Sequence, residues 1–124
     1  MANNPTVQVR RIYDEPNTDD GTRVLVDRLW PRGMSKTRAH LDEWCRTVAP
    51  STQLRTWYHH EPERFDEFTR RYLGELTTSE RAAALAHLRD ISNHDTLTLL
   101  TATKVVNLSE AVVLATLLTP QSGQ

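Results

Sequence analysis

One apolar run near the start of the chain constrains the fold more than any other segment. Val24, Leu25 and Val26 are consecutive, and a strand that is apolar on both faces is typical of the centre of a parallel sheet covered by helices. Pro31 excludes further pairing as a central strand, because proline has no backbone N–H to donate. The sequence therefore predicts a buried strand over residues 23–29 of an α/β domain.

The rest of the chain predicts helices that connect a few strands. Apolar residues that recur at intervals of three and four indicate helices, and alternation indicates strands. We expect strands over 7–12 and 96–101, and helices over 37–48, from 52, from 62 to 76, over 79–92 and over 110–118. Strands joined by helical crossovers are parallel, so 23–29 and 96–101 should be neighbours.

The length and these elements predict one domain. A chain of 124 residues can bury enough surface to fold without disulfides or metals, and it is too short for two ordinary domains. We expect a single compact α/β domain over residues 1–124, with a tail from about 119. Its sheet should be small and mainly parallel, with about three strands and four to five helices.

The charge balance argues against several classes of partner. Fifteen basic residues against sixteen acidic ones leave a formal net charge of -1, which creates no long-range field to attract nucleic acid or anionic lipid. The apolar run over 111–118 is far shorter than the roughly 20 residues that cross a bilayer. We therefore expect no nucleic-acid or membrane partner.

Cysteine usage indicates the compartment. Cys45 is the one cysteine and cannot form an internal disulfide, and the polar start of the chain lacks the pattern of a signal peptide. A cytoplasmic location is the expectation. Cys45 lies on the apolar stripe of the helix predicted over 37–48, so we expect it to pack in the core.

The loops that follow the two central strands are the expected place for a ligand. In open α/β sheets, ligands bind beyond the carboxyl ends of the strands. Here those loops span 27–36 and 101–109. Arg28, Arg32 and Lys36 could cradle an anion there, while Asp27 orients one of them or serves as a general base.

A structural alternative accounts for the same charges. Burying Asp27 and Arg28 next to an apolar strand is costly unless they are paired or bound to a ligand. In this alternative, Asp27 accepts backbone N–H groups of the loop and Arg28 pairs with Asp42 or Glu43. Both interpretations stay open on the sequence alone.

The start of the helix expected after Pro50 offers a second anion-binding feature. Ser51 and Arg55 lie in its first turn, where free N–H groups and the helix dipole favour anions; as an alternative, Ser51 serves only as the N-cap. His59 and His60 lack the i, i+4 spacing of helical zinc ligands. With no Cys-x-x-Cys pair and no glycine-rich phosphate loop, we expect neither a metal nor a cofactor.

Several sequence motifs along the chain, taken together, resemble those of a known protein family. The central segment Val-Asp-Arg-Leu-Trp-Pro-Arg-Gly, over residues 26–33, resembles the YeaO-like branch of the bacterial domain-of-unknown-function 488 family. Further matches lie at 11–14, Asp20-Gly21, Lys36, 41–44, 49–51, Leu54-Arg55, Phe68, Tyr72, Glu75-Leu76 and 97–100. The resemblance covers nearly the whole chain.

The resemblance implies a small α/β domain in a bacterial cytosol, in a family without an established activity. It supports Asp27, Arg28 and Arg32 as site residues, and it adds Ser51 and Arg55. Relatives usually carry a histidine at the start of the last helix, where this chain has Glu110. If that histidine is catalytic in relatives, this chain has lost the step or performs it with Glu110.

Two functions follow from these observations. In the first, the domain binds or acts on a small phosphorylated or carboxylated molecule, with Arg28, Arg32 and Arg55 as anion clamps and Asp27 or Glu110 as the proton-transfer group. In the second, it is a non-catalytic interaction or regulatory module with a structural Arg/Asp network, for which a filled strand-end crevice and a mutual Asp27–Arg28 pair would be diagnostic. Whether the chain is an enzyme, and its oligomeric state, stay open.

Overall fold

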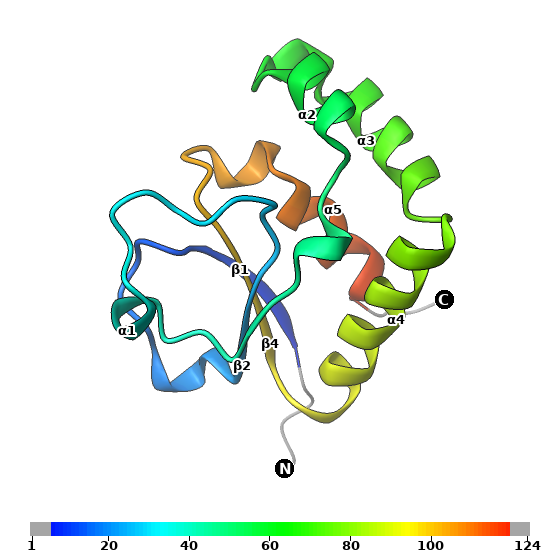
Figure 1. Cartoon of the computed structure of the whole chain (residues 1–124). Coiled ribbons are helices and arrows are strands. Elements are labelled where there is room, and N and C mark those ends of the chain that lie inside the picture. The colour runs from blue at the N-terminus through cyan, green and yellow to red at the C-terminus, as the bar shows by residue number, and fades with distance from the viewer. Residues whose placement is uncertain (1–5, 120–124) are drawn as a thin grey trace.

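The computed structural model describes residues 6–119 and contains a parallel sheet of four strands (Figure 1). The strands are β1 (Val7–Arg11), β2 (Thr22–Leu25), β3 (Glu43–Trp44) and β4 (Leu97–Thr101), in the order β1-β4-β2-β3. The α/β class is confirmed, with one strand more than expected. The predicted neighbours are confirmed as well, since β2 and β4 pair in parallel with Val24 opposite Leu99. Most of the predicted tail, from residue 120 on, lies outside the described residues.

The helix predicted over 37–48 is wrong. Helix α1 covers only Lys36–Ala39 and ends where His40 adopts a left-handed conformation with φ 50°. The chain then pairs with the free edge of β2 as β3, and the Cys45 N–H donates to the Leu25 carbonyl at 2.8 Å. A 3₁₀ turn, η2 (Arg46–Val48), follows. A sheet edge supplies hydrogen-bond partners that helical periodicity cannot reveal.

The central strand is shorter than the predicted 23–29. Regular β2 ends at Leu25, although the Val26 N–H still donates to the Leu100 carbonyl at 3.1 Å. From Asp27 the chain turns away from the sheet. Arg28 therefore belongs to the loop beyond the strand, not to the strand itself.

The other predicted helices are confirmed, with small shifts at their ends. They are α2 (Thr52–Tyr58), α3 (Phe65–Glu75), α4 (Ser79–His94) and α5 (Glu110–Leu118). Three further 3₁₀ turns are η1 (Thr18–Asp20), η3 (Pro62–Arg64) and η4 (Val106–Leu108). The Ser51 hydroxyl accepts a hydrogen bond from the Leu54 N–H at 3.1 Å, so Ser51 is the N-cap of α2 as predicted.

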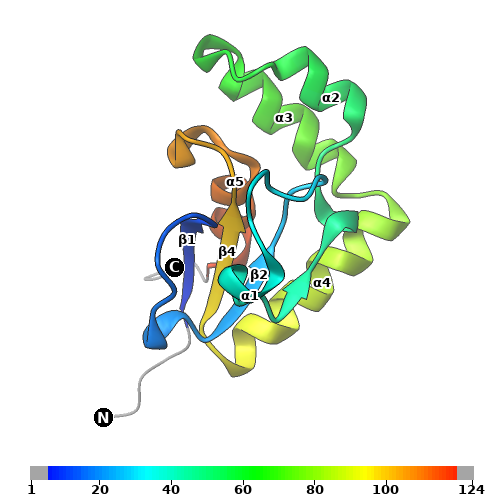
Figure 2. The same ribbon diagram turned by 60° about the vertical axis from the view of Figure 1, so that its left-hand side comes forward.

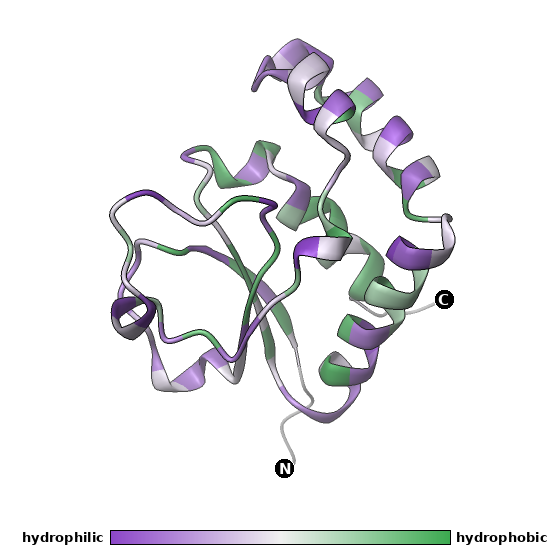
Figure 3. Cartoon of the chain, in the orientation of Figure 1, coloured by the Kyte–Doolittle hydropathy of each residue, from purple (hydrophilic) through white to green (hydrophobic). Residues whose placement is uncertain are grey.

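Apolar side chains cover both faces of the sheet. On one face, Leu97 and Leu99 pack with helices α2, α3, α4 and α5 in the larger core. On the other face, Leu25 and Leu100 pack with a smaller group under the loop that contains α1. Figure 2 shows the layers from the side, and Figure 3 shows how hydrophobic α5 is along its length. This double cover explains why apolar residues follow one another directly at Val24-Leu25-Val26 and at Leu99-Leu100.

Helices α2 and α3 form an arm that extends past the carboxyl ends of the strands (Figures 1 and 2). Two buried tyrosines attach the arm to the body. The Tyr72 hydroxyl donates to the Val48 carbonyl at 2.5 Å, and the Tyr58 hydroxyl donates to the Leu108 carbonyl at 2.7 Å. The arm therefore overhangs the edge of the sheet at which ligands bind in this fold class.

A buried ion pair fixes the opposite end of β2. Arg23 and Asp20 contact each other at 2.5 Å, with side chains 7% and 2% exposed. The same guanidinium donates to the carbonyls of Ala39 and His40, at 2.9 and 3.1 Å. These contacts satisfy Arg23 inside the fold and join η1 to α1.

The length of the helices bears on membrane association. Among residues 6–119, no helix combines the length and the apolar composition that crossing a bilayer requires.

Candidate ligand-binding site

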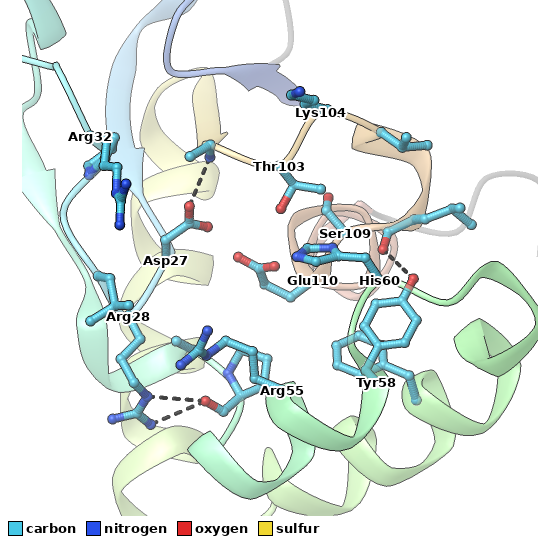
Figure 4. A pocket seen from close by; sticks show the side chains of 18 of the residues that line it. Asp27, Arg28, Arg32, Arg55, Tyr58, His60, Thr103, Lys104, Ser109 and Glu110 are labelled. Carbon is cyan, nitrogen blue, oxygen red and sulfur yellow. Dashed lines mark hydrogen bonds between the residues drawn. The ribbon is translucent and has the colours of Figure 1, made fainter.

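A cavity of about 630 Å³ lies beyond the carboxyl ends of β2 and β4, beneath the arm (Figure 4). Most of the residues that line it come from the loop after β2, from α2 and the turns on either side of it, and from the segment between β4 and the start of α5, and Tyr13 and Phe68 add to the lining. Those with polar or charged side chains include Asp27, Arg28, Arg32, Arg55, Tyr58, His60, Thr103, Lys104, Ser109 and Glu110. Segments that are distant in the sequence thus meet at the edge predicted for a ligand.

Asp27 is held firmly at the floor of this cavity. Its two carboxylate oxygens accept hydrogen bonds from the Thr101 hydroxyl and the Ala102 N–H, each at 2.8 Å. Its backbone carbonyl accepts a third from the Trp44 indole N–H at 2.7 Å. The Asp27 side chain therefore ties the end of β2 to the end of β4 through neutral donors.

Glu110, the first residue of α5, faces Asp27 across the cavity floor (Figure 4). Burial, a hydrogen bond with Asp27 and the negative charge of Asp27 together raise the pKa of Glu110 well above its ordinary value, and the nearby Arg55 charge offsets only part of this effect. Asp27 accepts two hydrogen bonds from donors that are fixed in the fold, so its carboxylate is held in position opposite Glu110.

Arg28, Arg32 and Arg55 all line the cavity. Arg28 donates to the Pro50 carbonyl from Nε and Nη2, at 3.4 and 3.2 Å, which holds its guanidinium at the cavity edge. Arg32 and Arg55 are exposed. Within the part of the chain that the structure describes, none of these three forms an ion pair with an acidic side chain.

Two of the predicted ligand-binding residues lie elsewhere. Lys36 is exposed on α1 and does not line the cavity. Ser51 also lies outside the lining, because its hydroxyl caps α2 and donates to the Glu75 carboxylate, while its N–H donates to the same carboxylate at 2.8 Å. The structure therefore brings together Asp27, Glu110 and three of the five predicted binding residues.

The structural alternative for Asp27 and Arg28 holds in one half only. Asp27 does accept a loop N–H, from Ala102. Arg28 forms no ion pair with Asp42 or Glu43 among residues 6–119. Asp42 instead accepts the Arg23 N–H at 2.8 Å, and Glu43 contacts His87. Asp27 and Arg28 do not pair with each other among the described residues.

Several lining residues were not predicted. Thr103 and Lys104 lie in the loop over 101–109 that the strand-end rule selected, although the sequence analysis named neither as a binding residue. His60 is exposed and also joins the lining, in a turn where His59 and His60 both adopt positive φ, 46° and 55°. No sequence signal indicates this turn, because non-glycine residues seldom adopt it.

The cavity also has an apolar part. Leu29 and Val105, from the two strand-end loops, line it while their side chains remain 59% and 55% exposed. Leu108 and Pro62 add to this surface. A ligand can therefore bury hydrocarbon next to the charged groups. Across residues 6–119, no three His, Cys, Asp or Glu side chains gather into a group able to hold a metal ion.

Comparison with known proteins identifies relatives over nearly the full length. A family model described as "Inactive DUF488-N3 subclade" matches residues 6–123. An uncharacterised protein of Mycobacterium tuberculosis is 51% identical over 118 residues, covering 95% of this chain and 98% of the relative. Uncharacterised protein YeaO of Escherichia coli is 43% identical over 109 residues, covering 88% of this chain and 93% of the relative. The resemblance to the YeaO-like branch is thereby confirmed. No solved structure matches the chain.

Proposed function

The chain belongs to the DUF488-N3 family, in the subclade described as inactive. From this premise we propose that it binds a small phosphorylated or carboxylated molecule in the strand-end cavity and does not transform it. The convergence of Arg28, Arg32 and Arg55 on one cavity carries the proposal. These guanidinium groups come from two separate segments and have no acidic partner among residues 6–119. Guanidinium groups suit carboxylate and phosphate because of their planar set of donors.

The roles predicted for the two carboxyl groups change with this proposal. Asp27 and Glu110 were candidates for proton transfer, and they face each other as such a pair would. Because the subclade is described as inactive, we assign them to ligand recognition and to holding the strand ends. We place this binding in the cytoplasm, which suits a protein whose Cys45 is unpaired and buried.

A titration with inorganic phosphate at constant ionic strength tests the proposal. We expect phosphate to raise the melting temperature, since a ligand that binds only the folded state stabilises it. Arg55→Ala should weaken binding about tenfold or more, because a charge-assisted hydrogen bond contributes about 1.5–3 kcal/mol. Arg38→Ala is the matched control, since Arg38 is exposed on α1 and outside the cavity. Equal phosphate affinity in the wild type and in Arg55→Ala would refute the site.

The interaction or regulatory module remains the second candidate. The exposure of Leu29 and Val105 beside the cavity favours it, because exposed apolar side chains gathered in one place are typical of interaction surfaces. It predicts that Arg28→Ala lowers stability and that phosphate leaves the melting temperature unchanged. The same titration therefore separates the two functions.

A further inference from the structure

The cavity holds acidic and basic side chains that form no ion pair with each other among residues 6–119. Asp27 and Glu110 lie at its floor, and Arg28, Arg32 and Arg55 lie around them (Figure 4). Within residues 6–119, neither carboxyl group lies within ion-pair distance of a Lys, Arg or His side chain. The two sets of charges share one cavity and remain separate.

Neutral groups of the protein keep these charges apart. Asp27 is oriented by the Thr101 hydroxyl and the Ala102 N–H, and Arg28 is oriented by the Pro50 carbonyl. Charges in a partly enclosed site are costly without a counter-charge. In a purely structural network, Asp27 and Arg28 would pair directly, whereas here each is held in place with its charge left for another partner.

We propose, building on the proposed function, that the ligand is zwitterionic, with an anionic group that contacts the arginines and a protonated amine that contacts Asp27 and Glu110. The apolar part of the lining, Leu29, Val105 and Leu108, accommodates a hydrocarbon body beside the two charged groups. A carboxylate or a phosphate serves equally as the anionic group. A ligand of this kind supplies both missing counter-charges at once.

The proposal accounts for the proton on Glu110. Burial and the neighbouring Asp27 favour the protonated form of Glu110, which limits the negative charge on the cavity floor. An ammonium group supplies a positive charge, so the Glu110 proton leaves to solvent when the ligand binds and the charge balance is kept. Burial and Asp27 raise the pKa of Glu110, so this group holds a proton more strongly than an ordinary carboxyl group until an ammonium group binds beside it.

Other titratable groups also act on Glu110. Arg55 of α2 favours its ionised form, while the charge of Glu110 raises the pKa values of Tyr58 on α2 and Tyr72 on α3, both of which burial raises first. The tyrosines stay protonated at neutral pH as a result. Because His60 and Lys104 also line the cavity, the Glu110→Gln variant is what assigns a proton release to Glu110.

Matched ligand pairs test the proposal. We would measure binding of L-leucine against 4-methylpentanoate, and of phosphoethanolamine against ethyl phosphate, by calorimetry in two buffers of different ionisation enthalpy. In at least one pair, the amine-bearing member should bind ten-fold or more tightly than its partner and release up to one proton. Glu110→Gln, which keeps the shape and removes the ionisable group, should reduce that preference to near one and abolish the proton release. Glu80→Gln, an exposed carboxylate outside the cavity, is the control and should change neither.

The outcomes separate this inference from the proposed function. If phosphate binds but no amine-bearing member exceeds its partner, the zwitterion inference is overturned and the anion site stands. If neither phosphate nor any member of the pairs binds, both fail. A Mg²⁺-induced rise in melting temperature that Glu110→Gln abolishes would make a metal ion the counter-charge and overturn the inference. A melting curve of Glu110→Gln without ligand verifies that the variant is folded.

Discussion

Ser51 and Glu75 are joined by two hydrogen bonds, from the Ser51 N–H to Oε1 at 2.8 Å and from the Ser51 hydroxyl to Oε2. The first residue before α2 is thereby tied to the last residue of α3. The two chain segments that connect the arm to the body are held together at this point, so the position of α2 above the cavity depends on the pair.

Ser51→Ala should destabilise the protein without weakening phosphate binding more than about twofold. The N-cap hydrogen bond to Leu54 is lost, which costs about 1 kcal/mol, and Glu75 loses a donor. Thr52→Ala is the control, because Thr52 is exposed on α2 and does not line the cavity. Urea unfolding and phosphate titration measure the two effects. A tenfold loss of phosphate affinity at unchanged stability would return Ser51 to the binding site.

Asp20→Asn should be strongly destabilising at neutral pH, by about 3–5 kcal/mol, because Arg23 is left buried without its ionic partner. Burial opposes ionisation of Asp20, but hydrogen bonds from the Asn17 N–H and Arg23, with the charges of Arg10 and Arg23, outweigh it and lower its pKa. The stabilisation is therefore present above pH 3.8, the ordinary value, and is lost as the pH falls through the folded-state pKa.

Urea unfolding of Asp20→Asn at pH 7 and pH 3 measures this dependence. The difference in free energy of unfolding between the wild type and Asp20→Asn should be smaller at pH 3 than at pH 7. Glu67→Gln is the control: hydrogen bonds from Arg70 and Arg71 lower the pKa of Glu67 to about 2, but the group is exposed, so its loss should matter far less. If the difference in free energy of unfolding does not change with pH, the pH dependence does not come from Asp20.

Glu110→Gln should stabilise the ligand-free protein at neutral and higher pH. A carboxyl group whose pKa is raised in the folded state lowers the free energy of unfolding as the pH rises. The reason is that the unfolded chain releases the proton from about pH 4.5 while the folded chain retains it. The variant has no such group, so its free energy of unfolding does not fall in this way. Above pH 4.5, the difference in free energy of unfolding between the variant and the wild type should grow by about 1.4 kcal/mol for each unit by which the pKa is raised. Urea unfolding at several pH values checks it, and parallel stability profiles would show that Glu110 does not titrate in this way.

Gly21→Ala and Gly33→Ala form a contrasting pair. Both glycines have positive φ, 62° and 72°, but a Cβ at Gly21 would lie 2.2 Å from the Thr96 carbonyl oxygen, whereas a Cβ at Gly33 meets nothing within 4 Å. Gly33→Ala should cost about 1 kcal/mol, the penalty of a left-handed conformation. Gly21→Ala should cost clearly more, since it also displaces the start of β2 from β4. Equal melting temperatures for the two variants would contradict the close approach at Gly21.

The sequence predicted most helices and the parallel pair β2–β4, because their patterns are local. Ser51 followed by a helix, and apolar residues spaced along α3, need no information about neighbours. The segment around Trp44 shows the limit. Its apolar spacing fits a helix, but the free edge of β2 offers hydrogen bonds that a helix over the same residues would forgo.

The candidate site divides in the same way. Asp27, Arg28 and Arg32 follow a strand that its own composition identifies, and the general position of strand ends in α/β sheets places them at one edge. His60 and the separation of the opposite charges depend on the backbone turn after α2 and on hydrogen bonds to Thr101, Ala102 and Pro50, which no local pattern records.

By itself, the sequence determined the α/β class, the central strand and the residue types available at its end, because burial periodicity and turn chemistry are properties of short segments. The tertiary structure alone decided that Glu110 faces Asp27, that Ser51 forms hydrogen bonds with Glu75 and that Lys36 lies outside the cavity. Those contacts depend on where the sheet and the arm place segments that are distant along the chain, and side-chain contacts at a few ångströms are set by that placement.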